Sequence, residues 1–164
     1  MEYKHLSNER KEYIDNLAEK LRQDYCSNSK IDFQRIAEDN DITLVKTTKI
    51  MAELAVRTNG KNYVFIGNMA IPSVKKFATA HGLGHRILNH TSDIPVDIKE
   101  DEANYFAEKL TDIKNNKKYG KLSDIEAIFD VLMHPIKCSR YVHHAGEDAI
   151  KLITRLEAKA QEEK

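Results

Sequence analysis

Two histidines separated by three residues are the feature of this sequence with the clearest chemical meaning. His81 and His85 lie in a segment, Phe77 to His90, whose pattern predicts an α-helix. A spacing of four residues offsets two helical side chains by only about 40°, so both imidazoles can reach one ion from the same face. Zinc is the expected ion, because neutral imidazole nitrogens bind it at about 2.0 to 2.1 Å.

The residue that follows the first histidine is unusual for such a pair. In the zinc-binding pattern HExxH, this position holds a glutamate that takes a proton from the attacking water. Here the position holds Gly82, which has no side chain that could accept a proton or orient a water molecule. Because the loss of a positioned general base costs a factor of about 10² to 10⁴ in rate, Gly82 marks the place of the missing catalytic group.

The same region resembles the ImmA/IrrE metallopeptidases. Lys76 to His90, KFATAHGLGHRILNH, is similar to the metal-binding segment of that family, and Glu100 to Ala107, EDEANYFA, is similar to the glutamate-rich segment that follows it. The resemblance covers about residues 9 to 110. It implies a cytoplasmic zinc endopeptidase, a hydrolase often encoded in mobile elements, phages or stress operons, that cleaves a helix-turn-helix repressor.

The resemblance also implies a third metal ligand, Glu102, beside the two histidines. Its neighbours Glu100 and Asp101 compete for this role, and Asp101 is the runner-up. His90 follows His85 by five residues, a spacing that turns it away from the metal face of a helix. We therefore expect His90 to pack or to form hydrogen bonds rather than to bind the metal.

Two departures from the family pattern bear on function. One is Gly82, and the other is the run from Leu110 to Ile113, LTDI, where the family commonly has apolar residues. Three interpretations remain open: a pseudoprotease that keeps the metal site as structure, an active-site variant of a peptidase, or an enzyme whose base comes from elsewhere. An alternative function is a non-catalytic regulatory protein that sequesters a repressor or another partner in the same cleft. A weaker possibility is a helical adaptor that uses residues 124–164 for its contacts.

The elements that would position these residues follow from local patterns. Apolar residues recur at three- and four-residue intervals between Ser7 and Asp24, and Asp32 can cap a short helix that ends near Asn40. Further helices are expected over 73–89 and 98–114, and two more beyond residue 124. Strands are expected over 42–46, 52–57 and 63–66, with an Asn-Gly turn between the last two. These elements predict an α+β fold, a zincin-like domain with a small antiparallel sheet, a metal-binding helix and a helical C-terminal extension.

One strand carries a functional expectation. If the strand Tyr63, Val64, Phe65 and Ile66 is the edge strand that lines the cleft, it could pair with an extended peptide and hold a substrate. A plain sheet strand is equally consistent with the pattern.

Composition limits the remaining classes of function. Lysine plus arginine balance aspartate plus glutamate at 26 each, so no global charge favours nucleic acid, and a protein partner is expected instead. Neither a signal peptide nor a membrane span is predicted, which favours the cytoplasm. The 164 residues suit a single domain, in which residues 115–164 form an unrecognised extension. Its histidines, His134, His143 and His144, could donate to an oxyanion, although surface roles are the better interpretation.

Overall fold

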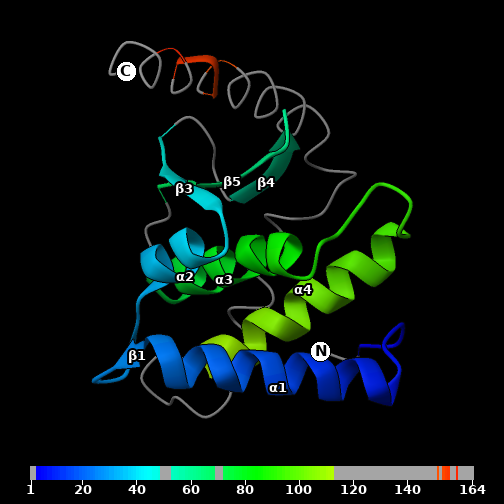
Figure 1. The fold of residues 1–164 in the computed structure, drawn as a ribbon. Helices are drawn as coiled ribbons and strands as arrows, with labels where there is room; N and C mark the ends of the chain where they lie inside the picture. The colour runs from blue at the N-terminus through cyan, green and yellow to red at the C-terminus, as the bar shows by residue number, and fades with distance from the viewer. Residues whose placement is uncertain are drawn as a thin grey trace.

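The structure of the chain is a computed structural model that describes residues 3–48, 53–68 and 72–112, together with 151, 153–155 and 158. Its helices are α1 (Asn8–Tyr25), α2 (Phe33–Asp39), α3 (Pro72–Ile87) and α4 (Val96–Thr111). Its strands are β1 (Cys26–Ser27), β2 (Lys30–Ile31), β3 (Ile42–Lys46), β4 (Glu53–Thr58) and β5 (Lys61–Ile66). The sheet of β3, β4 and β5 lies on one side of α3, and α1 and α4 lie on the other side (Figure 1). The fold is therefore mixed α+β, with α3 as its central layer.

Local capping explains where the first two helices begin. The Ser7 side chain accepts a hydrogen bond from the Arg10 backbone N–H, and the Asp32 side chain accepts one from the Arg35 N–H. Each cap satisfies one of the backbone donors that a helix leaves unpaired at its N-terminus. The predicted helix starts near Ser7 and Asp32 are thus confirmed.

The three-stranded sheet has the order β3-β5-β4. β4 and β5 form the expected antiparallel hairpin, with Thr58 opposite Lys61 across the turn at Asn59 and Gly60. β3 runs parallel to β5, with Leu44 opposite Val64. The expectation of an antiparallel sheet was therefore wrong for this pair, because β5 returns from β4 in the direction of β3 and lies between β3 and β4. The short antiparallel pair β1–β2 was not expected.

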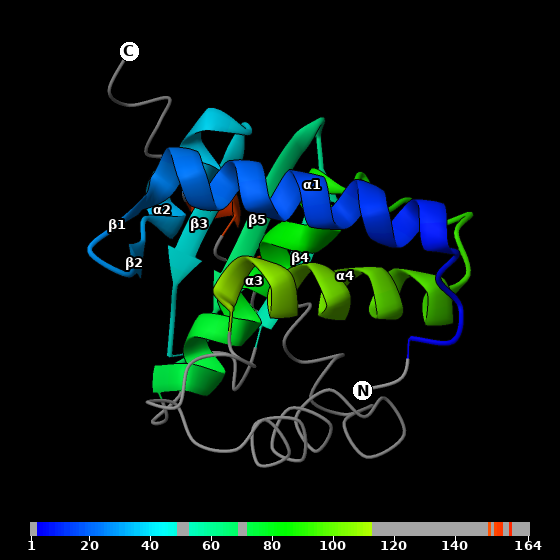
Figure 2. The ribbon, with the colours of Figure 1, turned by 90° about the horizontal axis from the view of Figure 1, so that it is seen from below.

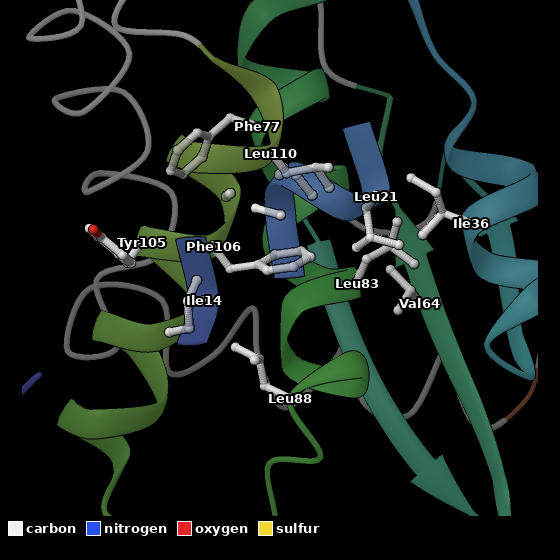
Figure 3. Packing of buried hydrophobic residues seen from close by; sticks show 14 of the residues in the cluster. Ile14, Leu21, Ile36, Val64, Phe77, Leu83, Leu88, Tyr105, Phe106 and Leu110 are labelled. Atoms are coloured by element: carbon white, nitrogen blue, oxygen red, sulfur yellow. The ribbon is translucent and has the colours of Figure 1, made fainter. Parts of the chain in front are cut away.

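The hydrophobic core fills the space between the sheet and the helices. Val64 and Ala55 face α3, whereas Leu54 and Tyr63 face the opposite side of the sheet, where Ile153 packs. This alternation follows from the two-residue period of a strand. Figure 3 shows side chains from all four helices and from β5 meeting in one cluster.

Helices α3 and α4 approach each other closely at one glycine. A Cβ atom at Gly84 would lie 2.9 Å from Cδ1 of Phe106 and 3.5 Å from the Cα of Ala103. The absence of a side chain at Gly84 therefore lets α4 pack against the C-terminal half of α3. On the other side, α1 and α4 run side by side (Figure 2). No helix in the described part of the chain is long and apolar enough to cross a membrane.

Candidate metal centre

The imidazole rings of the two histidines of α3 face each other closely enough to bind one metal ion. Nε2 of His81 lies 2.9 Å from Nε2 of His85. His81 is fully buried, and the side chain of His85 is 12% exposed. The prediction that the i, i+4 spacing brings both imidazoles to one point is confirmed.

Helix α4 contributes a carboxylate to the same point, and that carboxylate belongs to Glu100. Its Oε2 lies 3.5 Å from Nε2 of His81, and its Oε1 lies 3.5 Å from Nε2 of His85. Among the described residues, His81, His85 and Glu100 form a set whose ligand atoms all lie within 4.8 Å of one another. These three residues could hold a metal ion, and we refer to them as the metal centre.

The consecutive acids of α4 point in three directions, as a rotation of about 100° per helical residue requires. Glu100 faces the two histidines, whereas Asp101 accepts hydrogen bonds from the backbone and ring of His5. Glu102 is buried on a third side, away from the metal centre. Glu102, the third ligand that the resemblance implies, therefore contacts other residues. Glu100 is the acid that lies beside the two histidines.

Glu102 lies at the start of a chain of hydrogen bonds that ends at the metal centre. Both of its oxygens accept hydrogen bonds from Arg10, at 2.7 and 2.6 Å, and Oε2 also lies 2.9 Å from Nε2 of His90. Nδ1 of His90 lies 2.8 Å from Nδ1 of His85. With Nε2–H of His90 donating to Glu102, its Nδ1 accepts from Nδ1–H of His85. The lone pair of His85 Nε2 then faces the metal centre, as a metal ligand requires.

The end of α3 explains why His90 can contact His85. Asn89 adopts a left-handed backbone conformation with φ of 55°, which turns the chain back on the helix. The His90 backbone N–H donates to the carbonyl oxygen of His85 at 3.0 Å, which closes the helix end. His90 is therefore a hydrogen-bonding residue, as expected, although it lies beyond the helix rather than on its far face.

His81 is oriented in the same way from α4. Its Nδ1 lies 3.0 Å from Oδ1 of Asn104, an atom that can only accept, so Nδ1–H is the donor. Both Nε2 lone pairs, of His81 and His85, then point at each other across 2.9 Å. Two lone pairs at that distance repel unless a cation or a proton lies between them. The donor set thus fits a divalent cation with a preference for nitrogen and oxygen ligands, such as zinc.

Burial sets the protonation of the metal centre. It lowers the pKa of His81 to about 3, against a weaker raising effect of the Asn104 hydrogen bond. Burial also lowers the pKa of His85, and it raises the pKa of Glu100 to about 7. Both histidines are therefore neutral near pH 7, the form that binds metals.

A further carboxylate, Glu53, enters this region from the first position of β4. Its Oε2 lies 3.8 Å from Nε2 of His81, and its side chain is only 2% exposed. A Cβ atom on Gly82 would lie 2.6 Å from Oε1 of Glu53 and 2.7 Å from Cγ1 of Val64. Burial, the largest cause, raises the pKa of Glu53 well above its ordinary value, as does the nearby Glu100 charge. The space in front of Gly82 is therefore filled by Glu53 and Val64.

The metal centre opens into a pocket of about 650 Å³. The residues that line the pocket come from β4, from the end of α3 with the loop that follows it, and from the start of α4; they include Glu53, Ala55, Arg57, His85, Arg86, Lys99 and Glu100. Among the residues that the structure describes, β4 has a strand neighbour on one side only. Its other edge is the one available to an extended peptide.

This topology corrects the assignment of the substrate strand. Tyr63, Val64, Phe65 and Ile66 belong to β5, which is hydrogen-bonded to β3 on one side and to β4 on the other. The backbone of β5 has no edge left to pair with a peptide, so the edge strand beside the metal centre is β4. The sequence pattern could not reveal this, because it does not state which strand lies in the middle.

Sequence reasoning also missed Glu53 and Arg10. The sequence did contain one signal for Glu53. Residues two apart in a strand point to the same face, so Glu53 shares the core-facing side of its strand with Ala55, where an acid is unusual. The predicted extension over residues 115–164 lies outside the described residues, apart from a few positions between 151 and 158. Its histidines, His134, His143 and His144, lie outside them too.

Neither the family models, nor the curated proteins, nor the solved structures with which the chain was compared give a match.

Proposed function

We propose that this chain is a metal-dependent hydrolase of the peptidase type, with zinc held by His81, His85 and Glu100. The observation that carries the proposal is the convergence of these three side chains, with ligand atoms within 4.8 Å of one another, at the wall of an open pocket. Three protein ligands and an open position are typical of catalytic zinc sites, whereas structural sites are closed by four protein ligands. Bound zinc would supply Lewis-acid chemistry, which activates water and polarises a carbonyl group.

The pocket also suits a peptide. The edge of β4 that has no strand neighbour among the described residues lies beside the metal centre, so an extended chain that pairs with it would place its backbone carbonyls next to His85 and Glu100. Arg57, Arg86 and Lys99 contribute positive charge to the pocket wall. The class of partner that the ImmA/IrrE resemblance implies, a helix-turn-helix repressor, belongs to this proposal as its first candidate substrate.

A second candidate function is binding without cleavage, in which the same cleft sequesters its partner. The observation that favours it is Gly82, since the helix itself offers no general base beside the metal centre. The two functions differ in one outcome. A bound partner is recovered intact from a binding protein and is recovered cut from a peptidase.

The metal content of the purified protein tests the proposal first. We expect about one zinc per chain after removal of metal and reloading, and no bound zinc in His85→Ala. Glu100→Gln should weaken zinc binding, whereas Asp101→Asn, the matched change at the next residue, should not, because Asp101 contacts His5 instead. No zinc in the folded wild-type protein would contradict the proposal.

Glu102→Gln separates the two assignments of the third ligand. If Glu100 is the ligand, cobalt bound in place of zinc should keep its visible spectrum in Glu102→Gln and change it in Glu100→Gln, since the spectrum reports the coordinating atoms. The opposite pattern would establish Glu102 as the ligand, as the resemblance implies.

A further inference from the structure

The carboxylate of Glu53 stands where the side chain of residue 82 would stand. A Cβ atom at Gly82 would approach Oε1 and Cδ of Glu53 to 2.6 and 2.9 Å, distances that real Cβ atoms essentially never show. Glu53 therefore lies against α3 in the space that a side chain at residue 82 would otherwise occupy. Gly82 thus does more than lack a carboxylate: it leaves the space that the carboxylate of Glu53 occupies.

We propose that Glu53 supplies, from β4, the acid–base carboxylate that Gly82 does not supply from α3. This role rests on the proposed hydrolase function and specifies its missing component. It selects one of the open interpretations of Gly82, an enzyme whose base comes from another position.

The distances place Glu53 beside the metal centre without making it one of the ligands. Its Oε2 is 3.8 Å from Nε2 of His81. It does not belong to the described set of His81, His85 and Glu100 whose ligand atoms lie mutually within 4.8 Å. A general base needs this relationship, because it acts on a water molecule that lies between it and the centre.

The nearby positive charge of Arg86 favours the charged form of Glu53, but it does not outweigh the cost of burying this carboxylate. The side chain is 2% exposed, and burial of a carboxylate costs free energy that an apolar residue would not cost. Ala55, two residues along the same face of β4, packs against the core as an apolar residue. Glu53 is thus a buried acid on a strand face that continues with the apolar Ala55, and it lines the pocket.

The step in which Glu53 takes part is the hydrolysis of a peptide bond by water. Oε2 accepts a proton from water while the water oxygen forms a bond to the peptide carbonyl carbon, and the carbonyl π electrons move to its oxygen. The carbonyl re-forms as the C–N bond breaks, and Glu53 gives its proton to the departing nitrogen. One water is consumed, and the carboxylate ends as it began.

Acetohydroxamate binding to the cobalt-loaded protein tests this role without a known substrate. The probe binds a metal through its oxygens and carries a proton that a carboxylate beside the centre can accept. Loss of a hydrogen bond to a charged group weakens binding about tenfold to a hundredfold. We expect that loss in Glu53→Gln and Glu53→Ala, and no change in Glu108→Gln, a buried glutamate that accepts from Tyr3.

The cobalt spectrum and the thermal midpoint complete the test. Glu53→Gln should keep the cobalt spectrum and affinity of the wild type, and its metal-free thermal midpoint should be equal or higher, since a buried carboxylate has been removed. Unchanged acetohydroxamate affinity, an altered cobalt spectrum, or a midpoint lowered by several degrees would overturn the acid–base role. A wild-type protein that binds no cobalt would instead overturn the proposed function on which this role rests.

Discussion

Arg10 donates to both carboxylate oxygens of Glu102, at 2.7 and 2.6 Å, although 92 residues separate them in the chain. The pair links α1 to α4, and through His90 it reaches the ring of His85. The hydrogen bonds from Arg10 and His90 outweigh the effect of burial and lower the pKa of Glu102, so this carboxylate stays charged. Arg10 therefore orients a candidate metal ligand, His85, from outside the metal centre.

Removal of Arg10 should weaken metal binding without changing the ligands. Loss of a hydrogen-bond partner of a metal ligand typically lowers metal affinity about 10- to 100-fold, and since Arg10 acts on His85 through Glu102 and His90, we expect a loss of at most this size in Arg10→Met, measured by competition with a chelator. The cobalt spectrum should keep its form. Arg35→Met is the control, because Arg35 pairs with Asp39 on the surface. An equal loss of affinity in both variants would contradict the orienting role.

Gly82→Ala should destabilise the fold. Alanine gains about 1 kcal/mol of helix propensity over glycine, but the added Cβ would overlap Glu53 and Val64, and overpacking typically costs about 1–3 kcal/mol. We expect a net loss of about 1 kcal/mol in the free energy of unfolding, measured in urea. The loss should shrink in a Glu53→Ala background and persist in part, since the contact with Val64 remains. Equal losses in both backgrounds would show that Glu53 does not occupy this space.

Zinc affinity should fall as the pH drops through about 7. The pKa of Glu100 is raised to about 7, so below that pH the metal must displace a proton from this carboxylate. The histidine pKa values are lowered, so their protons compete only in more acidic solution. Titration of zinc binding between about pH 8 and 5 should therefore show a decline that Glu100→Gln lacks. The same decline in both proteins would assign the proton to another group.

The metal-free protein should lose stability in acid. Burial lowers the pKa values of His81, His85 and His90 from 6.5, so below about pH 6.5 the unfolded chain takes up protons that the folded chain does not. The raised pKa of Glu100 acts in the opposite direction, because the folded chain then holds the extra proton. Urea midpoints should thus fall with pH, and they should fall more steeply in Glu100→Gln. A flat profile would contradict the burial of neutral histidines.

The local parts of this fold could be read from the sequence, because their signals are local. β3 has the predicted ends, the first helix begins near Ser7 as predicted, and Asp32 caps the second helix as expected. The parallel pairing of β3 with β5 depends on how α2 and the hairpin pack, and no short pattern encodes it. The position of β4 at the edge depends on the same packing.

The candidate site divides in the same way. The spacing of His81 and His85 is enough to place them on one face of a helix. To identify which of the three adjacent acids faces them, one must know how α4 is rotated about its axis relative to α3, because each residue along the helix points in a different direction. That rotation depends on packing contacts of other α4 residues, such as the close approach of Phe106 to Gly84. Glu53 comes from another element altogether, so its proximity to Gly82 follows only from the tertiary fold.

The overlap between Glu53 and any side chain at position 82 also constrains how this site can change over evolutionary time. A side chain at position 82 would approach Oε1 of Glu53 to 2.6 Å, so acids at both positions would require one of them to leave this space. Positions 53 and 82 should therefore covary in related chains, with a glycine at 82 accompanying an acid at 53. A sequence search that requires the HExxH pattern would therefore miss related chains whose acid lies on the strand that corresponds to β4.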